Sequence, residues 1–219
     1  MRSIIFLVLA LFTEVAWSID STQCNPVPNP DGIGPWDYYD PKNREDDFRT
    51  SNIAGGNIHL VEKAHFTQKV ENLISGESSY LYWDIEYTLR RIPNHPRALW
   101  AASRYERSDK YVPHPKGQPR YSAECYFDRA IRFQPDNAIT HMLYAMHMQM
   151  GDRIKEAEGE YKLALDLDPN HPEIRYNVGL FYFKRKNYDK AYEHAVAAYD
   201  KGYPLPGLKN MLKGVKKWR

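Results

Sequence analysis

The chain has 219 residues, 42% of them hydrophobic and 26% charged, and its formal net charge is +2 at pH 7. This length suits one domain with a proper core or a short array of repeats. The near balance of charge argues against a general nucleic-acid binder. Cys24 and Cys125 are the only cysteines, which excludes a disulfide-rich scaffold and a Cys-x-x-Cys zinc or redox site.

Residues 1–18, MRSIIFLVLALFTEVAWS, have the form of a secretory signal peptide. Arg2 gives a positive start, an apolar run follows, and Ala16 and Ser18 are the small residues of a cleavage site. The apolar run is too short to span a bilayer, so no stable membrane insertion is expected. We predict export to the periplasm, the cell surface or the extracellular space, and in such an oxidising compartment Cys24 and Cys125 are predicted to pair, within a chain or between neighbours.

Residues 19–60 are predicted to form an irregular arm. The stretch CNPVPNPDGIGPWDYYDP (24–41) holds five prolines and cannot form a regular helix. Trp36, Tyr38 and Tyr39 make it too aromatic for a flexible linker, so we take them as anchors of a binding segment. Residues 20–47 carry seven acids and two bases, whereas the chain after Asp200 has six bases and no acid.

A 34-residue repeat follows the arm. The string PNHP occurs at 93–96 and at 169–172, and the related QPDN lies at 134–137. A polar, proline-containing insertion at 107–119 accounts for the extra spacing between the copies. Within each copy, proline is expected to end one helix, and the asparagine to cap the next. Two sets of alanines keep the same period: Ala123, Ala157 and Ala191, and Ala130, Ala164 and Ala198.

The pattern of Ala157, Tyr161, Ala164 and Pro169 resembles the tetratricopeptide repeat (TPR) family. The resemblance implies an all-α fold, namely an α-solenoid of three to four TPR helical hairpins over residues 61–205. Residues 206–219 are then expected to form a capping helix with one apolar face. That face consists of Leu208, Met211, Leu212, Val215 and Trp218.

The resemblance also implies a concave groove lined by the leading helix of each hairpin. An apolar groove of this size needs a cover, which we expect to be either the arm or another chain. The predicted lining residues are Phe66, Val70, Leu73, Trp100, Arg104, Met142, Met146, Met150, Tyr176, Leu180 and Phe183.

No sequence signature of an enzyme is present, so we predict no catalysis, no catalytic residue and no cofactor. HMLYAMHMQM (141–150) combines four methionines with two histidines, and thioether and imidazole groups suit copper(I). Packing by adaptable methionines explains the same stretch more simply. We therefore predict no metal site and keep copper handling as an alternative.

The sequence thus predicts an exported module that binds protein. We expect it to self-assemble head-to-tail, with the arm of one subunit in the groove or on the flank of the next; an unclosed contact of this kind gives a filament. The alternative is a monomeric periplasmic scaffold that binds a partner peptide of an envelope complex.

Overall fold

The structure is a computed structural model that describes residues 24, 27, 32–43, 58–110 and 121–218. All regular structure within these ranges is helical, which confirms the all-α prediction. The elements are η2 (Pro41–Asn43), α1 (Ile58–His65), α2 (Gln68–Glu71), α3 (Leu81–Arg91), α4 (Pro96–Tyr105), α5 (Ala123–Phe133), α6 (Ala138–Met150), α7 (Ile154–Leu167), α8 (Pro172–Lys184), α9 (Tyr188–Asp200) and α10 (Gly207–Gly214).

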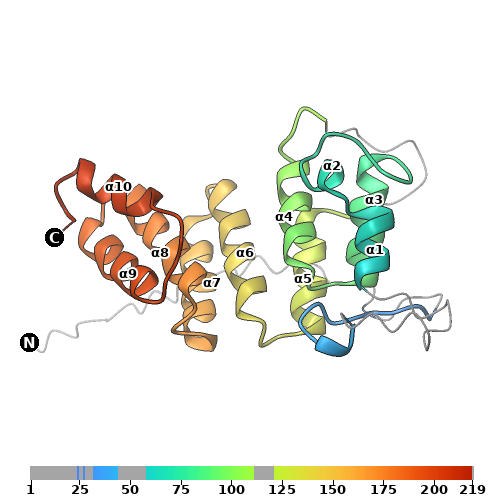
Figure 1. The fold of residues 1–219 in the computed structure, drawn as a ribbon, viewed down its shortest axis with the longest axis horizontal. Helices are drawn as coiled ribbons and strands as arrows, with labels where there is room; N and C mark the ends of the chain where they lie inside the picture. Colours follow the sequence, from blue (N-terminus) through green and yellow to red (C-terminus); the bar gives the residue numbers. More distant parts are fainter. Residues whose placement is uncertain (1–23, 25–26, 28–31, 44–57, 111–120, 219) are drawn as a thin grey trace, which may run out of the picture.

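The helices pack as successive hairpins, and Figure 1 shows them in two groups along the long axis of the molecule. The N-terminal half consists of the arm and α1–α5, with α1 and α2 packing on α3 and α4 on α5. The C-terminal half consists of the hairpins α6–α7 and α8–α9, closed at the end by α10. Helices α4 and α6 join the two halves. Among the described residues, no helix has the length and apolar character needed to cross a membrane.

Small and aromatic side chains bring the helices of the C-terminal half together. Ala157 and Ala164 are fully buried on α7, and Tyr161 between them packs on Phe181 of α8 with ring centroids 5.1 Å apart. Gly179 allows an even closer approach, because a Cβ atom there would lie 2.5 Å from Leu208 of α10. The predicted alternation of small residues and one aromatic is therefore what sets the helix spacing.

The 34-residue period is also visible in the backbone. The turn from α6 to α7 and the turn from α8 to α9 each hold one residue at positive φ, Asp152 at 59° and Lys186 at 60°. In both turns the next amide bonds back to the leading helix, Arg153 to Met148 and Asn187 to Tyr182, each at 3.0 Å. A non-glycine residue at positive φ is uncommon, so its recurrence one period later marks two copies of one turn.

The two PNHP strings begin helices as predicted, since Pro96 and Pro172 stand in the first turns of α4 and α8. The capping residue differs from the prediction. His95, not Asn94, is the N-cap of α4, and its Nδ1 accepts from the backbone N–H of Ala98 at 3.2 Å. At the second string too the N-cap residue is His171 and not Asn170, so in both copies the N-cap stands one residue after the asparagine.

A disulfide joins the arm to α5. Cys24 and Cys125 are bonded within the chain, with their Cα atoms 5.1 Å apart and a sequence separation of 101. Next to it, the side chain of Arg129 is only 1% exposed. It donates to the carbonyl oxygens of Leu89 at 2.6 Å, Arg90 at 2.9 Å and Val27 at 3.2 Å. The arm and the end of α3 are thereby tied to α5.

The predicted boundaries differ in detail from the observed ones. The helical region begins at Ile58 and not at 61, and its first leading helix is broken into α1 and the four-residue α2. Leu208 and Leu212 of the capping helix are buried, whereas Met211 and Val215 are 36% and 38% exposed. The predicted signal peptide, 1–18, lies outside the described residues, as does the insertion from residue 111 onward.

Candidate partner-binding groove

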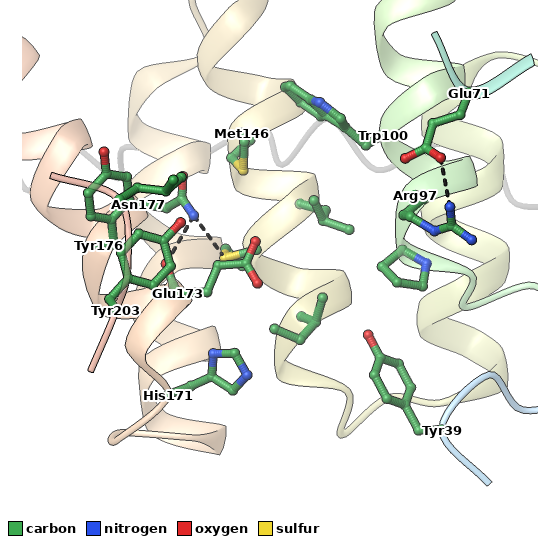
Figure 2. A pocket seen from close by; sticks show the side chains of 15 residues that line it. Tyr39, Glu71, Arg97, Trp100, Met146, His171, Glu173, Tyr176, Asn177 and Tyr203 are labelled. Atoms are coloured by element: carbon green, nitrogen blue, oxygen red, sulfur yellow. Dashed lines mark hydrogen bonds and ion pairs between the residues drawn. The ribbon is translucent and has the colours of Figure 1, made fainter. Parts of the chain in front are cut away.

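Two neighbouring clefts run across the leading helices α4, α6 and α8. The larger has a volume of about 490 Å³ and the smaller about 350 Å³. Both are lined by Trp100, Met146 and Asn177, so they form one continuous depression. We call this depression the groove. Figure 2 shows the larger cleft, with Trp100 and Arg97 on one side and Tyr176, Asn177 and Tyr203 on the other.

The floor of the groove is built by helical spacing. Met142, Met146 and Met150 are four residues apart on α6 and therefore share a face. Met142 is 1% exposed and forms the deepest part, and Met150 is 46% exposed at the open end. Trp100 of α4 and Tyr176 of α8 form the two walls. Tyr203, from the loop before α10, stacks on Tyr176 with ring centroids 4.3 Å apart.

One wall carries a network of paired charges. Arg97 pairs with Glu71 at 2.7 Å and with Glu62 at 2.6 Å, and His95 Nε2 lies 3.0 Å from Glu62. Burial lowers the pKa of His95, so its neutral ring donates from Nε2 to Glu62 while Nδ1 caps α4. Burial alone would raise the pKa of Glu62, but His95 and Arg97 outweigh it and bring the pKa to about 2. Because His95 is neutral, Arg97 faces the carboxylates of both Glu62 and Glu71, so this edge of the groove is held by ion pairs and carries a net charge of −1.

The opposite wall carries an acid without compensation. Glu173 is an exposed residue on the first turn of α8, and in Figure 2 its carboxylate points toward the open middle of the cleft. No ion pair joins this carboxylate to another described residue. The backbone carbonyl of Glu173 accepts from the side chain of Asn177 at 2.9 Å, and the same amide lies 3.5 Å from the sulfur of Met142.

The arm lies on its own subunit and reaches the groove only at its end. Trp36 and Tyr38 pack against Ile58, Val61 and Ile92, outside the groove. Tyr39 alone lines the larger cleft, and it is 42% exposed. The arm anchors were predicted to bind a neighbouring subunit; in the structure of the single chain, two of the three are half-buried and pack against the helix ends of the same subunit.

The side chain of Asn94 binds this arm through two hydrogen bonds. Its Oδ1 accepts from the N–H of Tyr38 at 2.9 Å, and its Nδ2 donates to Oδ1 of Asp37 at 2.7 Å. The other carboxylate oxygen of Asp37 accepts from Gln134 at 2.9 Å, and the ring of Tyr38 lies 4.6 Å from that of His95. The first PNHP string is therefore a binding surface for the arm, a role that sequence spacing does not predict.

The structure brings together six of the predicted groove residues. These are Trp100, Met142, Met146, Met150, Tyr176 and Leu180. Phe66, Val70 and Leu73 are instead buried in the core at 2%, 0% and 8% exposure, because α2 turns inward where the leading helix breaks.

Two further predicted residues point elsewhere. Arg104 donates to the backbone carbonyl of Glu71, and Phe183 packs on Tyr188 with ring centroids 5.2 Å apart. The groove is also lined by residues that were not predicted from the sequence, notably Tyr203, Leu205, His171 and Glu173. Tyr203 could have been noticed in the sequence, because it stands one period of 34 residues after Pro169 and so departs from the repeat pattern there.

The methionines and histidines of α6 lie on different sides. Nδ1 of His141 is 2.7 Å from Glu160 and Nε2 is 2.8 Å from the carbonyl of Pro135, two acceptors that favour a protonated ring. Nδ1 of His147 is 2.9 Å from Ser103 and 3.1 Å from Arg107. Over the described ranges, no group of three or more His, Cys, Asp or Glu side chains could hold a metal ion.

The fold and the groove define a helical-repeat scaffold. Residues 160–193, a stretch of one repeat period from α7 through α8 into α9, match the tetratricopeptide repeat model. A search of solved structures finds MamA MSR-1 C2, with 16% identity, a TM-score of 0.41, and coverage of 66% of this chain and 74% of that one. No curated protein matches the chain.

Proposed function

We propose that the protein is an exported scaffold that holds an extended segment of another protein in its groove. The observation that carries the proposal is the continuous depression across three leading helices, walled by Trp100 and Tyr176 and floored by Met146. Large apolar side chains that stay open to solvent mark interaction sites. Methionine adapts its shape to a partner, and tryptophan and tyrosine dominate binding energy at interfaces.

The dimensions favour an extended segment. Neighbouring packed helices lie roughly 8–10 Å apart, so a path over three helices is on the order of 18 Å. An extended chain rises about 3.3 Å per residue, so roughly six residues would cover this path. The chain's own arm supplies a precedent for a non-helical segment on this surface, since Asp37 and Tyr38 are held by the side chain of Asn94.

Export is supported by the disulfide and by the form of the first 18 residues. A disulfide between Cys24 and Cys125 fits an oxidising compartment, because disulfides are rare in the reducing cytosol. The periplasm, the cell surface and the extracellular space all satisfy this requirement. We assign neither a reaction nor copper handling to the groove, because the two imidazoles of α6 are engaged on its buried side.

Head-to-tail assembly through the arm is a secondary candidate. The opposite charges of the arm and the C-terminal tail favour it. Against it, Trp36 and Tyr38 already pack within their own subunit. We therefore expect the mature chain to be monomeric in solution. A filament of the mature chain in negative-stain images would restore the arm as the connector.

The experiment is site-specific photo-crosslinking in the native source. A photoreactive phenylalanine analogue replaces Met146 in the groove or, as the matched control, Leu163, which is 40% exposed on α7 and outside both clefts. We expect adducts with one defined segment of a partner from position 146 only. Equal adducts from both positions, or none from position 146, would contradict the proposal.

A further inference from the structure

The two PNHP strings are identical in sequence, but only the first is occupied. At the first string, Asn94 exchanges two hydrogen bonds with the arm, and His95 packs under the ring of Tyr38. At the second string, the side chain of Asn170 is exposed and bonds to no other described residue. Nδ1 of His171 is buried and without a hydrogen-bond partner, and it does not cap α8.

Both strings border the same cleft. Pro96 and Arg97 from the first string's helix line it, as do His171 and Glu173 from the second. In Figure 2, His171 and Tyr39 lie at the same end of the cleft, on opposite sides of it. The surface that His95 offers to an aromatic ring is therefore repeated, with His171, at the edge of the open groove.

The residues around the two strings differ in charge. Arg97, directly after the first string, corresponds to Glu173 after the second, and Ile92 corresponds to Asp168. Nε of Arg175, the nearest base, is turned to the carbonyl of Pro169, and its guanidinium reaches His194 of α9. The arm that occupies the first string places Asp37 beside Asn94, and Arg97 there is paired with Glu62 and Glu71. At the second string the carboxylate of Glu173 has no such partner among the described residues, so it favours a base at the equivalent place of its ligand.

We propose that the second PNHP string, Asn170 and His171 with Glu173, is a binding subsite for an extended protein segment that carries a lysine or arginine next to an aromatic residue. Asn170 bonds the backbone of the segment as Asn94 bonds that of the arm. The aromatic ring packs on His171, and the base faces Glu173 and Asp168. This inference rests on the proposed function and names the chemistry of its partner.

The test uses two synthetic peptides and the full mature chain. One peptide is GPWDYYDP, residues 34–41 of the arm; the other has the single change Asp37→Lys. The disulfide-tied arm occupies the first string at high effective concentration, so a free peptide reaches the second string. Fluorescence polarisation measures both affinities.

We expect the lysine peptide to bind about fivefold more tightly, the size of one partly exposed charge pair. Glu173→Arg should reverse the preference, and Asn170→Ala should weaken both peptides by about fivefold. Asp166→Arg makes the same change of charge at an exposed site on α7 outside the clefts and should leave the preference intact. Circular dichroism checks that each variant is folded.

The inference is overturned if the arm peptide binds as tightly as the lysine peptide or more tightly, or if neither peptide binds saturably at millimolar concentration. It is also overturned if the preference for the lysine peptide survives Glu173→Arg or disappears with Asp166→Arg. The crosslinking experiment tests the proposed function independently of this inference. If position 146 still crosslinks a partner while the peptides show no charge preference, the groove binds protein but its ligand is not basic at this place.

Discussion

The two halves of the molecule achieve a similar hairpin architecture by different means. In the C-terminal half, three residues join α6 to α7 and three join α8 to α9, and alanines and aromatic side chains pack there with aliphatic residues and methionines. In the N-terminal half, residues 106–122 separate α4 from α5, and residues 72–80 separate α2 from α3. There, buried polar groups and a disulfide take the place of repeat packing.

Asp84 illustrates the second strategy. It is 1% exposed, and one of its oxygens accepts from the backbone N–H groups of Glu77 at 2.6 Å, Ser78 at 3.1 Å and Ser79 at 3.2 Å. Its other oxygen lies 2.8 Å from Nδ1 of His65 on α1. One carboxylate therefore accepts the backbone N–H groups of an irregular loop, a role that packing between repeats does not fill. The comparison teaches that a degenerate repeat can persist where long-range polar contacts replace local ones.

The largest effect should come from removing the disulfide. The double variant Cys24→Ala, Cys125→Ala opens a loop of 101 residues, which in the chain-entropy model costs about 4–5 kcal/mol of unfolding free energy. Urea unfolding measures the loss. Hydrogen exchange should show lower protection in α3 and α5 while α7 and α9 keep theirs; an equal loss in both halves would show that the division is wrong.

The second largest effect should come from Arg129→Met. This change leaves three carbonyl oxygens next to the arm without their donor, and unsatisfied buried groups cost about 1–3 kcal/mol each, so a total of at least about 3 kcal/mol is expected. Arg132→Met on the same helix is the control, because its ion pair with Asp128 at 2.8 Å is partly exposed and is worth less than about 1 kcal/mol. Similar losses in both variants would contradict the role given to Arg129.

Acid should weaken the seam between the halves. Burial, and then the charge of Arg107, lower the pKa of His147 to about 4. The ordinary pKa of histidine is about 6.5, so this stabilising contribution is complete above that pH and is lost as the pH falls toward 4. From pH 7 to pH 5 the expected loss is about 2 kcal/mol. His194, with its pKa at about 4 through burial and Arg175, adds a similar loss within the C-terminal half.

The pH dependence can be assigned by substitution. His147→Gln should flatten the fall in unfolding free energy between pH 7 and pH 5, and His59→Gln, at an exposed position of α1, should not. His141 acts in the opposite sense. Its hydrogen bond to Glu160 raises its pKa against the effect of burial, so its contribution is present below pH 6.5 and disappears as the pH rises. An unchanged slope in His147→Gln would refute the assignment.

The smallest effect concerns glycine in the C-terminal half. Gly179→Ala should cost about 1–3 kcal/mol, because the new Cβ meets Leu208 at 2.5 Å and the carbonyl of Ala191 at 3.3 Å. Gly159→Ala on α7 meets nothing within 4 Å and should stabilise the helix by up to about 1 kcal/mol. Thermal unfolding of both variants measures the difference, and the same sign in both would contradict close packing at Gly179.

The regular half was predictable from sequence because its contacts are local. Ala157, Tyr161 and Ala164 repeat at the spacing that packs neighbouring helices, so the hairpins and most of the groove follow from the period. Phe66 and Val70 were placed wrongly because the period is lost where α1 and α2 separate. The role of Asn94 could not be predicted from the sequence either, because its partner Asp37 lies 57 residues earlier in the chain and no periodicity links the two.

The long separations in the N-terminal half bear on how the chain is made. Helices α6 to α9 meet their neighbours within one repeat, so they can form soon after synthesis, and local contacts fold quickly. The arm has to wait, because Asp37 binds Gln134, 97 residues later, and Cys24 binds Cys125. Ribosomes deliver the arm first, yet its binding surface exists only after α5 is complete. The segment that is synthesised early is thus fixed late, and until then its thiol is available to oxidation by other partners.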